Sequence, residues 1–151
     1  MAYEAVNTLD KVIDLIPAKV KRLVEEIYLL DDASNDNTYY AAVGYKMLKK
    51  LKKLKVYKNE KNLGCGGNQK KAYNYAIKKG FDILAMLHGD NQYDPRCLPY
   101  LLKPLIEDKA DFVFGSRMQD SPLKGGMPLY KFLGNKFLTF VENLLLRMNL
   151  S

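Results

Sequence analysis

Apolar side chains recur along much of the chain three or four positions apart, which is the period of an amphipathic helix. In residues 6–16 this spacing holds from Leu9 to Ile16, and Pro17 predicts that the helix ends there. The same spacing predicts four more helices farther along the chain. They are expected over residues 36–51, 69–79, 98–106 and 128–148.

Four short apolar runs separate these helices and predict strands. The run over residues 82–87 is continuous rather than alternating, as expected for a parallel strand that is buried on both faces. Strands that alternate with helices predict an α/β fold with a mostly parallel sheet flanked by helices. The four strands are expected over residues 26–30, 54–57, 82–87 and 111–114.

The segment 84–95, LAMLHGDNQYDP, is the most informative of the strand ends. Its apolar run stops at His88, and a carboxylate and a carboxamide follow at Asp90 and Gln92. Their oxygens suit Mg²⁺ or Mn²⁺, ions that commonly neutralise phosphates. If the backbone turns after the strand, both side chains can face one cation. Taken alone, an acid followed by a turn is common, so the segment by itself equally indicates a helix start.

Two other polar segments follow predicted strands, and each could serve either as part of a ligand site or only to cap a helix. Residues 31–36 contain Ser34 and Asp36, which are good helix N-cap types. The glycine-rich segment 62–67 lacks the spacing of a P-loop or a dinucleotide-binding loop, so it is equally a tight loop that caps a helix. Because the carboxyl ends of parallel strands share one edge of a sheet, several side chains are nonetheless expected to converge there. They are Asp31, Asp32, His88, Asp90 and Arg117.

Composition narrows the class of protein. The chain has 151 residues, 48% hydrophobic and 27% charged, as expected for one globular domain. Cys65 and Cys97 lie far apart with no paired spacing, so neither a disulfide framework nor a zinc knuckle is indicated. His88 is the only histidine, which rules out a multi-histidine metal site. No apolar run is long enough to span a bilayer, and the N-terminus has no signal-peptide pattern. We therefore expect a cytoplasmic protein.

Basic residues are in excess, with a net charge of +7 and eight lysines within residues 46–61. Such a cluster suits nucleic acid or a membrane surface, and its alternative is a solvated helix face followed by a loop. No arginine is interleaved with these lysines, and lysine is frequent throughout the chain. We therefore favour the solvated face and expect no nucleic-acid partner.

Four segments of the chain, in order and spacing, resemble the family 2 glycosyltransferases of the GT-A fold. They are LLDDASNDNT, KNEKNLGCGGNQKKAYNYAI, DILAMLHGDNQYDP, and ADFVFGSRM followed by GGMPLYKFLGNKFLT. The branch that they resemble most includes dolichyl-phosphate mannosyl- and glucosyltransferases. The resemblance implies a GT-A, Rossmann-like fold in a single partial catalytic domain over residues 1–151. It also implies transfer of a sugar from a nucleotide-diphosphate sugar to an acceptor, assisted by Mg²⁺ or Mn²⁺.

The resemblance further implies roles for individual residues. Asp90 matches a carboxylate of the family's metal motif and Gln92 a second ligand position, so both would hold the divalent cation. Arg117 matches a basic residue near the phosphates. With Asp90 it would be catalytic, because a cation and an arginine stabilise the charge of a leaving diphosphate. The donor would be contacted by Tyr3, Glu4, Asp31, Asp32, His88 and Gly89.

The chain departs from the family pattern in three places. His88 stands where the family usually has the first aspartate of its metal motif, and it could bond the ribose, ligate Mn²⁺ or be a plain turn residue. Only residues 2–5, Ala-Tyr-Glu-Ala, match the end of the family's first strand. That strand lies in the middle of the sheet, and its loss would expose two unpaired ladders. The family's acceptor segment is also absent. We therefore expect a partial domain that lacks the first strand.

The implied partners follow from the same resemblance. A nucleotide-diphosphate sugar is the expected donor, and a polyprenyl phosphate at the cytoplasmic face of a membrane is an open choice of acceptor. The helix over residues 128–148 fits such an interface, and its alternative is packing on the sheet. A homo-oligomer also stays open. The alternative function is a non-catalytic nucleotide-sugar-binding remnant or an assembly partner.

Overall fold

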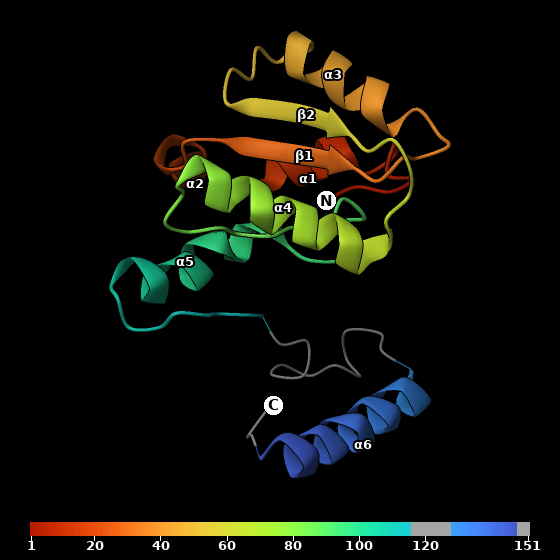
Figure 1. Cartoon of the computed structure of the whole chain (residues 1–151), viewed down its shortest axis with the longest axis vertical. Coiled ribbons are helices and arrows are strands. Elements are labelled where there is room, and N and C mark those ends of the chain that lie inside the picture. The colour runs from red at the N-terminus through yellow and green to blue at the C-terminus, as the bar shows by residue number, and fades with distance from the viewer. Residues whose placement is uncertain (116–127, 148–151) are drawn as a thin grey trace. The chain divides into compact units, whose positions relative to one another are not determined.

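The computed structural model describes residues 1–115 and 128–147 (Figure 1). The predicted site residue Arg117 lies outside the described residues. The chain divides into two compact units, Met1–Phe112 and Val113–Ser151, and each is described here by itself. The single partial catalytic domain over residues 1–151 stays a prediction.

The first unit is built on two parallel strands, which confirms the predicted α/β class (Figure 1). Strand β1 (Ile27–Asp31) pairs with β2 (Leu54–Lys58) in a register that places Ile27 opposite Leu54. Helix α3 (Thr38–Leu48) connects them, because two parallel strands need a crossover between the end of one and the start of the next.

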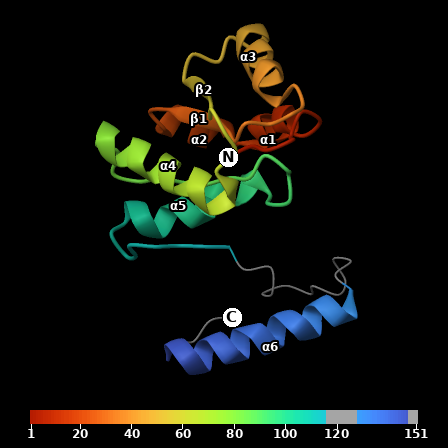
Figure 2. The same cartoon turned by 45° about the vertical axis from the view of Figure 1, so that its right-hand side comes forward.

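Helices cover both faces of this sheet, and Figure 2 separates them most clearly. One buried apolar cluster lies on the face covered by α1 and α3, where Leu29 of β1 packs with apolar side chains from both helices. On the opposite face, Tyr28 Oη donates to the carbonyl of Ala72 in α4 at 2.8 Å. The remaining helices of the unit are α1 (Leu9–Leu15), α2 (Ala18–Leu23), α4 (Gly64–Lys79), η1 (Pro95–Cys97) and α5 (Leu98–Ile106).

Two of the four predicted strands do not form among the described residues. Residues 82–87 have no regular structure, because the nearest edge of the sheet, that of β1, lies across an apolar groove from them. Residues 111–114 also pair with no strand in the described part of the chain, and Phe112 is 75% exposed there. A run of apolar residues forms a strand only if a second strand lies within hydrogen-bonding distance of it.

Helix α4 also differs from the prediction, because it begins five residues earlier than expected. Residues 62–67 were expected to form a glycine-rich turn, whereas the helix starts at Gly64. Asn62 Oδ1 accepts a hydrogen bond from the Gly64 N–H at 2.8 Å, so this asparagine turns the chain into the helix. Gly64 itself has a φ of 71°, which glycine adopts without strain.

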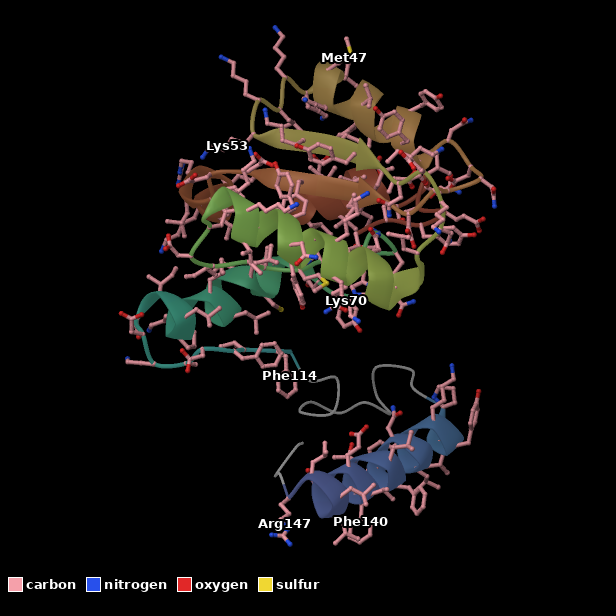
Figure 3. The ribbon with its side chains drawn as sticks, viewed as in Figure 1. Met47, Lys53, Lys70, Phe114, Phe140 and Arg147 are labelled. Atoms are coloured by element: carbon pink, nitrogen blue, oxygen red, sulfur yellow. The ribbon has the colours of Figure 1, made fainter. Side chains whose placement is uncertain are left out.

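Helix α2 was not predicted, and a distant lysine explains how it ends. Lys53 Nζ donates to the carbonyls of Lys21, Arg22 and Val24 at 3.3, 2.9 and 2.6 Å (Figure 3). These carbonyls belong to the last turn of α2 and the residue after it, which have no partner within the helix. A lysine that bonds the end of a helix from about thirty positions away leaves no signal in the sequence near that helix.

In the second unit, α6 (Leu129–Leu146) confirms the long helix predicted there. It buries none of its side chains, and Phe140 and Arg147 are seen projecting from it in Figure 3. Among the described helices, none has the length and apolarity that crossing a membrane requires.

We predict that Leu54→Ala lowers the free energy of unfolding by about 2–5 kcal/mol, because Leu54 is 1% exposed and the truncation leaves a cavity in the core. Urea unfolding measures this loss. The matched control is Leu48→Ala on α3, where the side chain is 76% exposed, and its effect should stay within about 0.5 kcal/mol. Equal losses for the two variants would contradict the described core.

Candidate functional site

A hollow of about 350 Å³ lies at the carboxyl end of β1. Its walls come from the N-terminal segment, the residue after β1, the start of α4 and residues 88–90. This is the sheet edge at which the sequence predicted a ligand site. Five of the predicted site residues line the hollow: Tyr3, Asp32, His88, Gly89 and Asp90.

The N-terminal segment forms one wall and is bonded to the end of β1. The Ala2 N–H donates to the Leu30 carbonyl at 3.0 Å, and the Ala2 carbonyl accepts from the Asp32 N–H at 2.9 Å. This is the bonding of a parallel bridge, which pairs Ala2 with Asp31. Asp32, which lines the hollow, is therefore fixed through its main chain.

The same segment is bonded on its other side to residues 87–89. The Met1 amine donates to the Leu87 carbonyl at 2.8 Å, and the Gly89 N–H donates to the Met1 carbonyl at 2.8 Å. Gly89 is also closely packed, because a Cβ there would lie 3.2 Å from both the Ala5 Cβ and the Met1 oxygen. The segment that carries Asp90 is thus held against the N-terminus.

The Asp32 side chain is held by a buried network that sequence analysis missed. Asp32 is 3% exposed, and its Oδ1 accepts from Asn59 Nδ2 at 2.7 Å and from the Leu63 N–H at 2.9 Å. Asn59 Nδ2 also donates to Asn68 Oδ1 at 3.1 Å, and its Oδ1 accepts from Lys71 Nζ at 2.7 Å. The one available signal was an asparagine placed two positions after the predicted strand 54–57, near the strand end where parallel sheets place ligand-site residues.

Asp31 and Glu4 do not line the hollow. Asp31 is fully buried, and its carboxylate accepts from the N–H and the hydroxyl of Ser34. The Glu4 N–H donates to Ser34 Oγ at 2.9 Å, and Glu4 has a left-handed φ of 47°. Both residues therefore stabilise the turn after β1 in this structure.

Asp90 begins a backbone turn, as the sequence analysis required for Asp90 and Gln92 to face one cation. Its Oδ1 accepts from the Gln92 N–H at 3.0 Å, and the residue between them, Asn91, has a left-handed φ of 58°. Asp90 lines the hollow and is exposed to solvent, whereas Gln92 is exposed outside the lining. The ring of His88 lies 5.3 Å from that of Tyr93, centroid to centroid, in a tilted contact.

Two groups around the hollow have shifted pKa values, one because of burial and one because of a neighbouring charge. Burial lowers the pKa of the Met1 amine, although the nearby Cys65 and Asp90 act in the opposite direction. The neighbouring charge of Glu4 raises the pKa of the Tyr3 hydroxyl. Tyr3 therefore stays protonated at neutral pH and can donate a hydrogen bond to a ligand.

Asp90 at the hollow, together with Gln92 outside its lining, fits a metal ion that arrives with a phosphate ligand. In residues 1–115 and 128–147, no group of three or more His, Cys, Asp or Glu side chains could hold a metal by itself. Asp90 offers one carboxylate, and Gln92 a carboxamide two positions along. Mg²⁺ is commonly bound by one or two carboxylates together with waters and substrate phosphates. The donor set therefore fits such an ion and does not fit a closed structural metal site.

Comparison with known proteins identifies the family. Residues 1–150 match the family described as "Glycosyl transferase family 2", and the chain belongs to this family. The resemblance stated from the motifs is thereby confirmed.

Two relatives illustrate the match. The chain is 31% identical over 137 residues to a protein of Methanococcus voltae named "UDP-N-acetylglucosamine--dolichyl-phosphate N-acetylglucosaminyltransferase", which covers 80% of this chain and 52% of that protein. It is also 31% identical over 128 residues to an uncharacterized protein of Methanocaldococcus jannaschii. This match covers 83% of this chain and 52% of that protein. The chain spans about half the length of the curated relatives it matches. No solved structure gives a significant match.

We predict that Asn59→Ala lowers the free energy of unfolding by about 1–3 kcal/mol, because it removes a donor from the buried Asp32 and leaves Asn68 without that bond. Urea unfolding measures the change. Asn35→Ala, at an exposed position, is the matched control and should change stability by less than about 0.5 kcal/mol. If both variants unfold at the same urea concentration as the parent, the network does not hold Asp32.

Proposed function

We propose that the hollow beside β1 binds a nucleotide-diphosphate sugar and that the protein transfers the sugar from it to an acceptor. One observation carries this proposal: Asp32 and Asp90, far apart in sequence, line a single hollow at the carboxyl end of a parallel strand. The chain's membership of glycosyl transferase family 2 supports the reaction class.

The two carboxylates differ in environment, which supports different roles. Asp32 is buried and rigidly held by Asn59 and Leu63, as suits a residue that orients the nucleoside. Asp90 is exposed at the rim, where a hydrated cation can reach it. Tyr3, which lines the hollow beside Asp32, is the proposed donor to the base or ribose.

The diphosphate is proposed to lie between Asp90 and the start of α4. Gly64 and Cys65, the first residues of this sixteen-residue helix, line the hollow. The unpaired N–H groups and positive end of a helix dipole attract phosphate oxygens. This end of α4 therefore supports an anionic group in the same hollow as Asp90.

Enzymes of this family generally use a divalent metal, and we propose Mg²⁺ or Mn²⁺ held by Asp90 and Gln92. When bound, the ion supplies positive charge that stabilises the leaving nucleoside diphosphate. Asp90 would orient the diphosphate through this ion, in a turn fixed by the Gln92 N–H. Arg117 is proposed as a second cationic group at the phosphates, with Asp90 in the catalytic pair.

The acceptor is proposed to be a polyprenyl phosphate, because the Methanococcus voltae relative is named for dolichyl phosphate. Such an acceptor would place the protein at the cytoplasmic face of a membrane. Helix α6 supports this, since apolar and aromatic side chains such as Phe137 and Phe140 are more than half exposed on it.

The second candidate function is nucleotide-sugar binding without transfer, or a role as an assembly partner, including a homo-oligomer. It is favoured by His88, which stands where the family usually has the first aspartate of its metal motif. The two functions differ in turnover, because a binding remnant would retain the donor without releasing nucleoside diphosphate.

We predict that UDP-N-acetylglucosamine, UDP-glucose or GDP-mannose raises the melting temperature in the presence of Mn²⁺ or Mg²⁺ and that EDTA abolishes the rise. Asp90→Asn should weaken nucleotide-sugar affinity about 10-fold to 100-fold, since it removes the carboxylate ligand of the ion. Isothermal titration calorimetry measures the affinity, and release of UDP or GDP in the presence of a polyprenyl phosphate measures turnover.

Asp111→Asn is the matched control, because Asp111 is exposed and does not line the hollow. It should bind the donor as the parent does. Equal affinity for the parent and Asp90→Asn, or binding that ignores the metal, would contradict the proposed site. Binding without release of nucleoside diphosphate would favour the second candidate function.

A further inference from the structure

Helix α3 packs on the sheet with part of its surface and leaves three large apolar side chains exposed to solvent. The residues that it buries are Thr38 and Ala42, which are both small. Tyr40, Met47 and Leu48 are 69%, 73% and 76% exposed. A helix that contacts only the sheet is expected to bury its large apolar residues and to expose polar ones. The outward side of α3 is therefore suited to a further apolar contact.

The three exposed side chains share one face of the helix. Positions 40, 44, 47 and 48 follow the spacing i, i+4, i+7 and i+8, which is that of a single helix face. Gly44 lies between the others, and a Cβ added there would meet nothing within 4 Å. Met47 projects away from the two strands in Figure 3. We call Tyr40, Gly44, Met47 and Leu48 the outer α3 face.

The chain next to this face carries positive charge that no acidic residue nearby in the sequence offsets. Residues 37–59 contain no aspartate and no glutamate. The same stretch contains seven lysines, at positions 46, 49, 50, 52, 53, 55 and 58. A segment with charge of one sign attracts a surface of the opposite sign.

Three of these lysines have no partner in the part of the chain that the structure describes. The side chains of Lys46, Lys50 and Lys52 make no hydrogen bond, ion pair or ring contact there. Asp14 of α1, which reaches α3, accepts from the Tyr45 hydroxyl rather than from a lysine. The charge of the three lysines is therefore left to attract a partner from outside.

A membrane with anionic lipids fits both features of this surface. Lysines are attracted to its negative headgroups, and apolar and aromatic side chains enter the boundary between headgroups and acyl chains. A nucleic acid would engage the lysines but would leave Met47 and Leu48 in water. A second copy of the chain, joined through the same face, would bring two sets of these lysines together, and the two sets would repel each other.

We propose that the outer α3 face, together with Lys46, Lys50 and Lys52, docks the protein on a membrane that contains anionic lipids. The axis of α3 lies along the membrane surface, Met47 and Leu48 enter the headgroup boundary, and the lysine ammonium groups contact lipid phosphates. None of these residues lines the nucleotide-sugar hollow or belongs to α6. The surface therefore goes beyond the proposed function and does not depend on sugar transfer.

Binding of the full chain to lipid vesicles, measured by sedimentation, tests the charged part of this surface. Vesicles of phosphatidylcholine and phosphatidylglycerol should bind the parent at least about tenfold more tightly than vesicles of phosphatidylcholine alone. The triple variant Lys46→Gln/Lys50→Gln/Lys52→Gln should bind the anionic vesicles at least about tenfold more weakly than the parent. The matched control, of equal net charge, changes three exposed lysines on α2 and α4 to glutamine: Lys19, Lys70 and Lys78. It should lose less than about threefold.

The double variant Met47→Gln/Leu48→Gln tests the apolar part. Glutamine has a helix propensity close to those of methionine and leucine, so α3 should keep its structure. The affinity for anionic vesicles should fall about tenfold, whereas Ile77→Gln, at an exposed position of α4, should bind as the parent does. Urea unfolding at the parent's midpoint checks that the double variant is folded, as expected for changes at two exposed positions.

A tryptophan on α3 reports the contact directly, because the chain contains no other tryptophan. In Leu48→Trp, the emission maximum should shift to shorter wavelength when anionic vesicles are added, since the indole leaves water. In Tyr100→Trp, at an exposed position of α5, the maximum should not shift. None of these measurements needs a nucleotide sugar, so their outcome is independent of the proposed function.

Three results would overturn the proposal. In the first, the α3 lysine variant and its control bind anionic vesicles equally, which would assign membrane contact to another surface. In the second, Met47→Gln/Leu48→Gln binds as the parent does, as expected of a polyanion site, and displacement of the vesicles by an RNA duplex would identify such a site. In the third, the parent forms a dimer that Met47→Gln/Leu48→Gln breaks, since a second copy would then cover the outer α3 face.

Discussion

The alternating main-chain bonds of Met1 and Ala2 are the interaction on which the site depends. They tie the end of β1 to residues 87–89, two segments that have no direct main-chain bond to each other among the described residues. Without these bonds, the Asp32 and Asp90 carboxylates would belong to separate loops. With them, both face one hollow, at the sheet edge where α/β proteins bind their ligands.

The hollow has a rigid part around the buried Asp32 and a solvent-accessible part around Asp90. Asp32 is fixed by Asn59 and Leu63, and Asn59 is itself held by Asn68 and Lys71. Fully bonded buried networks of this kind define one geometry. The rim that carries Asp90 is exposed to solvent, which suits a residue that meets a cation and a diphosphate entering together.

Sequence patterns predicted the parts of the fold that depend on local spacing. The strands that became β1 and β2, the helices α1, α3, α5 and α6, and the turn after His88 all follow from residues close together in the chain. The remaining features depend on distant partners. Lys53 closes α2, and Asn59 holds Asp32 across 27 positions. Residues 82–87 form no strand because the groove separates them from β1.

The account is tested most directly by locating a bound Mn²⁺ ion in solution. With Mn²⁺ and UDP added, paramagnetic broadening in the amide NMR spectrum should centre on Gly89, Asp90 and the start of α4 at Gly64, and Asp90→Asn should remove it. Broadening centred on another acidic pair, such as Glu107 and Asp108, or spread without a centre and unchanged in Asp90→Asn, would contradict a metal-diphosphate site in the hollow beside β1.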